Sequence, residues 1–248
     1  MNCSLTNFNV SVSSIKTFLE CPEKWYHIYV LKHKKPSSYS EKIGDRVHYF
    51  IEHGEITGTP LTPLEEVEAI RIFKSIDGEA LAFGKEAIKE EWFKTQLNYK
   101  NFFSTFMAKI DAYKYYPETK TIKVIDWKTG KLFEDKLIKL QLEVYSFFLF
   151  NAFPEAEHFE GQYYYLKNKA MGVKPYTYPY NEITEEPTTL KLTREYSTKT
   201  LKERIDLIYS MMINYQTDRN VQKQYKEKPN GLCTAKFCDA YEWCEKCR

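Results

Sequence analysis

Two aspartates and a lysine are the residues of this sequence with the clearest capacity for chemistry. Asp111 lies near the end of one expected strand, and Asp126 lies near the end of the next, followed by Trp127 and Lys128. Residues that face each other on antiparallel strands lie about 5 Å apart, so the two carboxylates could share a hard divalent cation, which prefers oxygen ligands. Asp126 and Lys128 share a face because strand side chains alternate. The lysine would then stand beside the metal, where a water can be activated.

The same three residues have an ordinary interpretation as well. An Asp-x-Lys tripeptide is common by chance, so Asp111, Asp126 and Lys128 could be strand-end residues with a surface ion pair. The segments around these residues help to decide between a metal site and an ordinary surface ion pair.

The elements that must position these residues follow from hydrophobic periodicity. An amphipathic stretch follows Ser11 and Ser13, which could cap its start, and Pro22 predicts either a break in it or two short helices. The later periodic segments predict helices over 41–53, 63–83, 137–150 and 198–215, and strands over 88–97, 102–115, 121–127, 158–166 and 173–180. This order predicts an α/β fold, held as one domain over residues 1–248.

Composition excludes several classes of protein. The 248 residues carry 36 Lys+Arg and 34 Asp+Glu, and 43% are hydrophobic, which excludes a disordered chain or a polybasic binder but leaves room for a local basic cleft. The longest apolar run, over residues 145–153, is too short to span a bilayer. Residues 1–8 show no signal region, so we expect an intracellular protein with no membrane partner.

Several short segments occur in an order that is specific, although each alone is weak. Ser11–Ile15 is followed by Cys21-Pro22, and the remaining segments are Gly44–His48, Ala108–Asp111, Val124–Gly130 and Gln141–Tyr145. Together they resemble the RecB-type branch of the PD-(D/E)XK nucleases. That branch includes the nuclease domains of RecB and AddB, the CRISPR-adaptation exonucleases and several phage exonucleases. The resemblance covers residues 11–166, with a core over about 41–166, and the Cys-rich tail.

The resemblance implies a restriction-endonuclease-like mixed central sheet flanked by helices, and it assigns roles residue by residue. Lys128 becomes the catalytic lysine, acting with Asp111 and Asp126. Gln141 and Tyr145 match a Gln-x-x-x-Tyr motif near the active site and the DNA. A Glu on the first strand is also usual, and both Glu90 and Glu91 are candidates. The implied metal ligands are His48, Asp111, Asp126 and the backbone carbonyl of Trp127.

The function that the resemblance implies is a metal-dependent deoxyribonuclease. One or two Mg²⁺ or Mn²⁺ ions can supply the charge neutralisation and the activated water that phosphodiester hydrolysis needs. We expect an exonuclease acting on single-stranded DNA or DNA ends in recombination, repair or phage DNA processing. A structure-specific endonuclease, or a DNA-binding or assembly subunit without catalysis, is the alternative. The sequence has no Gly-x-x-x-x-Gly-Lys-Ser/Thr loop, so a helicase or recombination partner would be a separate protein.

The six cysteines are placed unevenly, with four of them after residue 232. In an intracellular protein such a cluster indicates a metal rather than disulfides. The resemblance implies a [4Fe–4S] cluster that ties the tail, residues 231–248, to the N-terminal helices of residues 11–35. Cys233 and Cys238 are further apart than the family pattern has them, which leaves Cys247 as a ligand, or Zn²⁺ at a four-Cys site, or no metal, as alternatives. The implied cluster ligands are Cys21, Cys233, Cys238 and Cys244.

Overall fold

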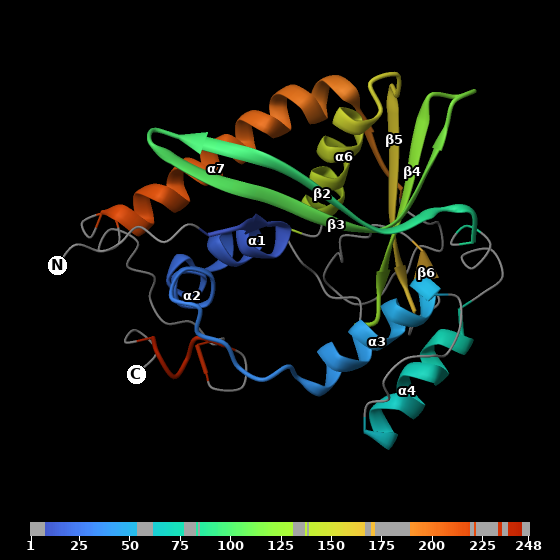
Figure 1. The fold of residues 1–248 in the computed structure, drawn as a ribbon, viewed down its shortest axis with the longest axis horizontal. Coiled ribbons are helices and arrows are strands. Elements are labelled where there is room, and N and C mark those ends of the chain that lie inside the picture. Colours follow the sequence, from blue (N-terminus) through green and yellow to red (C-terminus); the bar gives the residue numbers. More distant parts are fainter. Residues whose placement is uncertain are drawn as a thin grey trace, which may run out of the picture. The chain divides into compact units, whose positions relative to one another are not determined.

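The computed structural model describes residues 8–53, 62–76, 83, 85–130, 137, 139–166, 170–171, 189–218, 221, 233–234 and 238–244. Within this part of the chain, no helix is both long and apolar enough to cross a bilayer. The main elements (Figure 1) are β1 (Val10–Ser11), α1 (Val12–Glu20), α2 (Pro22–Trp25), η1 (Tyr26–Val30), α3 (Tyr39–His53), α4 (Pro63–Lys74), β2 (Ile88–Tyr99), β3 (Phe102–Tyr116), β4 (Thr121–Lys128), α6 (Leu140–Ala152), β5 (His158–Tyr165), β6 (Ala170–Met171), β7 (Leu190–Thr193), η2 (Tyr196–Thr200) and α7 (Leu201–Thr217).

The chain divides into two compact units. One comprises residues 1–36, 94–108 and 199–248, and the other comprises residues 37–93 and 109–198. A compact unit within a chain is not by itself an independent domain. A single nuclease domain over residues 1–248 therefore stays a prediction.

A mixed sheet organises the strands, which confirms the expected fold class. Its order is β1-β3-β4-β5-β6, with β2 paired to β3 and β7 paired to β5. β3 and β4 are antiparallel, whereas β4 and β5 are parallel. A parallel pair requires a crossover connection, and α6 lies in the chain between these two strands. β4 is buried along almost its whole length, as expected for a central strand with both faces covered.

α3 and α4 pack against one face of β4 and β5. The apolar positions of α3 recur at helical spacing, and they contact Ile125 and Trp127 of β4 and Tyr164 of β5. The two helices are also joined by Arg46, whose guanidinium binds both carboxylate oxygens of Glu66. The residues of α3 and α4 in this core are Ile43, Val47, Phe50, Ile51, Ala69 and Ile72.

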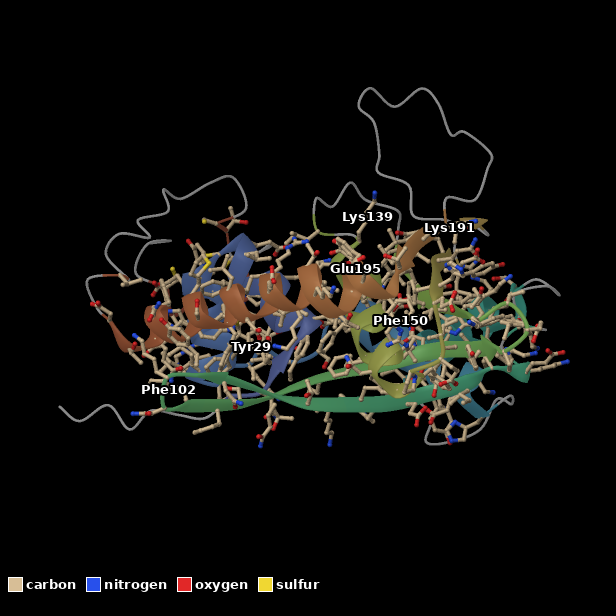
Figure 2. The ribbon with its side chains drawn as sticks, turned by 90° about the horizontal axis from the view of Figure 1, so that it is seen from above. Tyr29, Phe102, Lys139, Phe150, Lys191 and Glu195 are labelled. Atoms are coloured by element: carbon tan, nitrogen blue, oxygen red, sulfur yellow. The ribbon has the colours of Figure 1, made fainter. Side chains whose placement is uncertain are left out.

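α6 belongs to the same unit and is apolar on all sides, which is typical of a fully buried helix. Phe150 is completely buried, with its ring centroid 6.5 Å from that of Phe159 on β5. Arg194 donates to the Phe150 carbonyl at 2.8 Å, near the end of the helix where backbone carbonyls lack partners. Lys191 of β7 and Glu195 are exposed by contrast (Figure 2).

The other unit holds the N-terminal helices and the tail. Ser11 caps α1 through a reciprocal pair of hydrogen bonds with Ser14, and Pro22 begins α2, as the sequence predicts. The predicted packing of the tail against these helices is confirmed. Lys24 pairs with Asp239 at 3.0 Å, and the Lys35 ammonium donates to the Cys238 carbonyl at 3.3 Å.

Two predicted elements differ or cannot be compared. The helix expected over 63–83 is shorter, because α4 ends at Lys74, where the Ser75 hydroxyl donates to the Ile72 carbonyl at 2.7 Å. Residues 77–82 of that helix and the strand expected over 173–180 lie outside the described residues. β7 is a short strand that hydrophobic alternation did not reveal.

Candidate active site

The two aspartates face each other on β3 and β4. The antiparallel register pairs Ala112 with Ile125, and its continuation sets Asp111 opposite Asp126. Both side chains are buried, and the Trp127 backbone N–H donates to Asp111 Oδ2 at 2.9 Å. Burial, followed by the charge of Asp126, raises the pKa of Asp111 to about 7, against the opposing effect of His48. Two buried carboxylates so arranged favour a cation between or beside them.

His48 approaches these carboxylates from α3. Its Nε2 donates to the Trp127 carbonyl at 3.1 Å, and its Nδ1 lies 3.2 Å from Glu90 Oε1 and 3.6 Å from Asp111 Oδ2. Burial lowers the pKa of His48, but Asp111, Glu90 and Asp126 outweigh that effect and raise the pKa to about 9. The imidazolium form can donate from both nitrogens, so it balances the carboxylate charge of this site.

Gly44 permits the close approach of α3. A Cβ at this position would lie 3.0 Å from the hydroxyl oxygen of Thr129, directly after β4. Gly44 is one helical turn before His48, so the same face of the helix meets the end of β4. Neither Gly44 nor Thr129 was singled out from the sequence as a site residue. The Gly-x-x-x-His spacing was the available signal.

The structure distinguishes between the two glutamates on β2. Glu90 directs its carboxylate to His48 and to the Lys109 ammonium, which is 2.5 Å from Glu90 Oε2. Glu91 instead accepts a hydrogen bond from the Tyr113 hydroxyl. The backbone of Glu90 has a φ of 56°, which is uncommon for a residue with a side chain and interrupts the regular alternation of the strand.

Asp126 belongs to a second group of contacts, with Lys128 and two residues of α6. The Lys128 ammonium is 2.5 Å from Asp126 Oδ1 and donates to Gln141 Oε1 at 2.9 Å. The Gln141 amide donates to Asp126 Oδ2 at 2.6 Å, and the Tyr145 hydroxyl donates to the same oxygen at 3.0 Å. Burial, followed by the charges of Asp126 and Asp111, raises the pKa of Tyr145 well above its ordinary value. The tyrosine therefore acts as a neutral donor.

The residues that could hold a metal come from three elements. Among the described residues, His48, Glu90 and Asp111 each offer one ligand atom, and these atoms lie within 4.8 Å of one another. Carboxylate oxygens with an imidazole nitrogen suit Mn²⁺, and the oxygens also suit Mg²⁺. Asp126 is outside this group, because its carboxylate is turned toward Lys128, Gln141 and Tyr145. The Trp127 carbonyl adjoins the group through its contact with His48.

An open cavity of about 630 Å³ adjoins this group of ligand atoms. Among the described residues, five carboxylate side chains line it, and two side chains that can carry positive charge, His48 and Lys109, do so. Lys109 is a further residue of this cavity that the sequence interpretation did not single out. Lys109 lies two residues before Asp111 on the same strand, and side chains two residues apart point to the same face of a sheet. This spacing could have indicated that Lys109 lies near the site. The lining residues are Ser40, Glu41, Gly44, Asp45, His48, Tyr49, Glu52, Glu90, Lys109, Asp111 and Thr129.

The cysteines belong to the other unit. Cys21 is the N-cap residue of α2, and its Sγ accepts from the Lys24 backbone N–H at 3.4 Å. Cys233, Cys238 and Cys244 lie in the tail, and all four described cysteines are thiols rather than disulfides. Cys247 is outside the described residues. Among the described cysteines no three sulfurs lie within 4.8 Å of one another, so a closed site for a single ion is not formed by them.

Comparisons with known proteins bear on the family of this chain. A family model described as the PD-(D/E)XK nuclease superfamily matches residues 9–245. None of the curated proteins matches the chain. Among solved structures, the crystal structure of SSO0001 is similar at 17% sequence identity, over 94% of this chain and 97% of that chain, with a TM-score of 0.40 that is too low to support an argument. The family match extends over almost the whole sequence, and the chain therefore belongs to the PD-(D/E)XK nuclease superfamily, whose members are metal-dependent nucleases.

Proposed function

We propose that this chain is a Mg²⁺- or Mn²⁺-dependent DNA exonuclease of the RecB-type branch, which hydrolyses phosphodiester bonds of single-stranded DNA or DNA ends in recombination, repair or phage DNA processing. One observation carries the proposal. His48, Glu90 and Asp111 offer ligand atoms within 4.8 Å of one another, directly beside the ion pair of Asp126 and Lys128. Metal ligands next to a lysine that can donate protons suit hydrolysis of a phosphodiester.

The donor set fits a hard divalent cation. Glu90 and Asp111 are buried carboxylates, and a buried carboxylate is stable only when a cation or donors balance its charge. A bound ion would neutralise the phosphate and lower the pKa of a water for in-line attack. The residues that would hold metal are His48, Glu90, Asp111 and the Trp127 carbonyl, and Asp126 would join them by turning its carboxylate away from Lys128.

Lys128 is assigned the catalytic lysine role. Its ammonium is fixed between Asp126 Oδ1 at 2.5 Å and Gln141 Oε1 at 2.9 Å, and it lies over the ring of Tyr163 at 5.0 Å. A cation held in this way can orient the attacking water or stabilise the negative charge that develops on the phosphate. Gln141 and Tyr145 donate hydrogen bonds to Asp126 Oδ2, and so they fix the position of this carboxylate relative to the lysine.

Digestion of closed and open DNA tests the exonuclease assignment. Linear single-stranded DNA, closed single-stranded circles and supercoiled plasmid are each incubated with Mn²⁺ or Mg²⁺, with EDTA as the control. The proposal predicts that the linear strand is degraded and both closed substrates stay intact. Cleavage of the circles or plasmid would favour the endonuclease, and no cleavage of any substrate would favour the DNA-binding or assembly subunit. The catalytic interpretation is favoured because His48, Asp111, Asp126 and Lys128 are all present, with His48 paired to Asp111 and Lys128 paired to Asp126.

The tail is assigned a [4Fe–4S] cluster with a structural role, held by Cys21, Cys233, Cys238 and Cys244. Support comes from the contacts that tie the tail to the N-terminal helices, such as Lys24 to Asp239. A cluster across this long loop would stabilise the folded unit. Zn²⁺, or a site that uses Cys247, is the alternative.

Metal analysis of anaerobically purified protein tests this assignment. The proposal predicts a brown protein containing iron and acid-labile sulfide, both lost on Cys238→Ser, whereas Cys3→Ser is the matched control that retains them. Zinc in place of iron, or neither metal, would refute the iron–sulfur assignment. DNA unwinding is assigned to a separate helicase or recombination partner.

A further inference from the structure

Lys109 lies in the active-site cavity with no role in the assignments above. It precedes Asp111 by two residues on β3, and its ammonium is 2.5 Å from Glu90 Oε2, while Glu90 Oε1 faces His48. The lysine side chain is 38% exposed, whereas that of Glu90 is only 4% exposed. Lys109 therefore reaches from a buried carboxylate toward the open cavity.

The charged side chains that line the cavity around Lys109 are mainly acidic. Glu41, Asp45 and Glu52 line the cavity in addition to Glu90 and Asp111. A DNA strand is a polyanion, and it would be repelled by this wall wherever no cation faces it. His48 is engaged by two of its neighbours through both ring nitrogens. Among the described residues of the lining, Lys109 is thus the cationic side chain that can turn toward a phosphate.

The geometry of Lys109 is suited to such a contact. An ammonium has three N–H donors in a flexible arrangement, and Glu90 needs only one of them. The Glu90 carboxylate holds the lysine over the cavity, although its own backbone adopts an uncommon conformation with φ of 56°. A residue in that conformation persists where its surroundings fix it, and such positions concentrate at functional sites.

We propose that Lys109 forms a phosphate-binding subsite of the active-site cavity, which contacts a phosphate of the DNA strand next to the scissile one, with Glu90 as the residue that positions it. The inference rests on the proposed action on DNA. It adds a binding role for a residue outside the metal ligands and the catalytic lysine. Since the contact is to phosphate, it is independent of base sequence.

Salt dependence of DNA binding tests the subsite without cleavage. Binding of a fluorescent single-stranded oligonucleotide is measured in the Lys128→Ala background with Mn²⁺ present, as a function of salt. Adding Lys109→Ala is expected to weaken binding about tenfold at low salt and to reduce the slope of log Kd against log salt by about 0.7, the value for one phosphate contact on a single strand. Lys109→Arg is expected to restore the slope.

Lys114→Ala is the matched control, because Lys114 also lies on β3 and pairs with Glu86, but it does not line the cavity. It should leave the slope unchanged. The inference is overturned if Lys109→Ala leaves the slope of log Kd against log salt for DNA binding unchanged. If the variant also weakens Mn²⁺ binding about tenfold in calorimetry while that slope stays the same, the lysine acts only through Glu90. A different result would refute the proposed function alone. In that case the protein with Lys128 intact leaves DNA undigested, although Lys109→Ala still lowers the salt slope of DNA binding.

Discussion

Asp111 is a residue whose charge is useful for catalysis but unfavourable for the folded protein without metal. Its pKa is raised from 3.8 to about 7, chiefly by burial and then by Asp126. The pKa of Asp111 is higher in the folded protein than in the unfolded chain, so protonated Asp111 favours the folded state. This contribution to stability is fully present below about pH 3.8, and it is lost as the pH rises through about 7. At pH 8, therefore, ionised Asp111 destabilises the metal-free fold.

Asp111→Asn is accordingly expected to abolish DNA digestion while it stabilises the metal-free protein. An Asn oxygen can still accept the hydrogen bond that the Trp127 N–H donates to Asp111. We expect a gain of about 1 kcal/mol or more in the free energy of unfolding at pH 8, measured by urea denaturation in EDTA. The gain should disappear at pH 4. A variant that is less stable than wild type at pH 8 would contradict this interpretation of the carboxylate.

His48 makes metal binding dependent on pH. Its pKa of about 9 means that the imidazole is protonated at neutral pH, whereas a metal ligand must be neutral. Binding must therefore release a proton below pH 9, and the affinity for Mn²⁺ should rise about tenfold per pH unit from about pH 7 and level off above about pH 9. Calorimetry at several pH values measures this slope. His53→Ala, at the exposed end of the same helix, should keep the slope, and a pH-independent affinity in the wild type would exclude His48 as a ligand.

The choice between Glu90 and Glu91 shows where prediction from sequence stops at this scale. Residue types and spacing singled out Asp111, Asp126 and Lys128, the family resemblance added His48, and the fold pairs His48 with Asp111 and Lys128 with Asp126. Neighbouring strand residues normally point to opposite faces, but the sequence does not reveal which face is the site. The answer depends on the left-handed backbone of Glu90, which the surrounding contacts impose and local propensity does not predict.

At the scale of the elements, α3 positions its histidine only because a glycine lets the helix approach β4. Gly44→Ala places a methyl group 3.0 Å from the Thr129 hydroxyl, so either the helix or the threonine must shift. Alanine also favours a helix by about 1 kcal/mol over glycine, so stability should not fall. We expect Mn²⁺ affinity and DNA digestion to fall about tenfold, because the ligand geometry is displaced.

The double variant Gly44→Ala with Thr129→Ala is the control for this contact. It removes the hydroxyl that the new methyl group would meet, so it should recover most of the lost affinity and activity. If Gly44→Ala alone keeps full affinity, or if the second substitution recovers nothing, the close approach at Thr129 does not position His48.

Elements with strong periodicity could be predicted from the sequence, and those set by tertiary contacts could not. The β3–β4 hairpin and the helices α3 and α6 occur close to their expected bounds. α4 ends earlier than expected because a single side chain, Ser75, bonds back to the helix. β7 spans only Leu190–Thr193 and exists through its pairing with β5, which hydrophobic alternation over four residues is too short to reveal.

At the scale of the whole molecule, the two sites belong to different compact units. All the assigned metal ligands and Lys128 fall within residues 37–93 and 109–198, and the four assigned cysteines fall within the other unit. Cys238→Ser is therefore expected to lose iron and to lower the thermal unfolding midpoint, while Mn²⁺ affinity at the carboxylate site changes less than about twofold. Parallel loss of Mn²⁺ affinity would show that the sites are coupled.

Features of the whole molecule were the hardest to predict from the sequence. The order of motifs along the chain was enough to predict the superfamily, because its residues must meet on one sheet. The cysteine ligands could not be settled in the same way, since the spacing of Cys233 and Cys238 departs from the family pattern and the tail carries little periodicity. The division into two units also follows from long-range contacts that no local pattern encodes.

Digestion of end-labelled single-stranded DNA with Mn²⁺ tests the central claim most directly, with wild type, Lys128→Ala and Lys123→Ala compared at equal concentration. Lys123 lies on the same strand, where it is about half exposed and pairs with Glu160, so its variant controls for loss of a β4 lysine. We predict digestion by wild type and Lys123→Ala, stopped by EDTA, and a loss of at least about a hundredfold for Lys128→Ala, with a circular dichroism spectrum that shows the variant folded at the assay temperature. Equal digestion by wild type and Lys128→Ala would contradict the proposed active site.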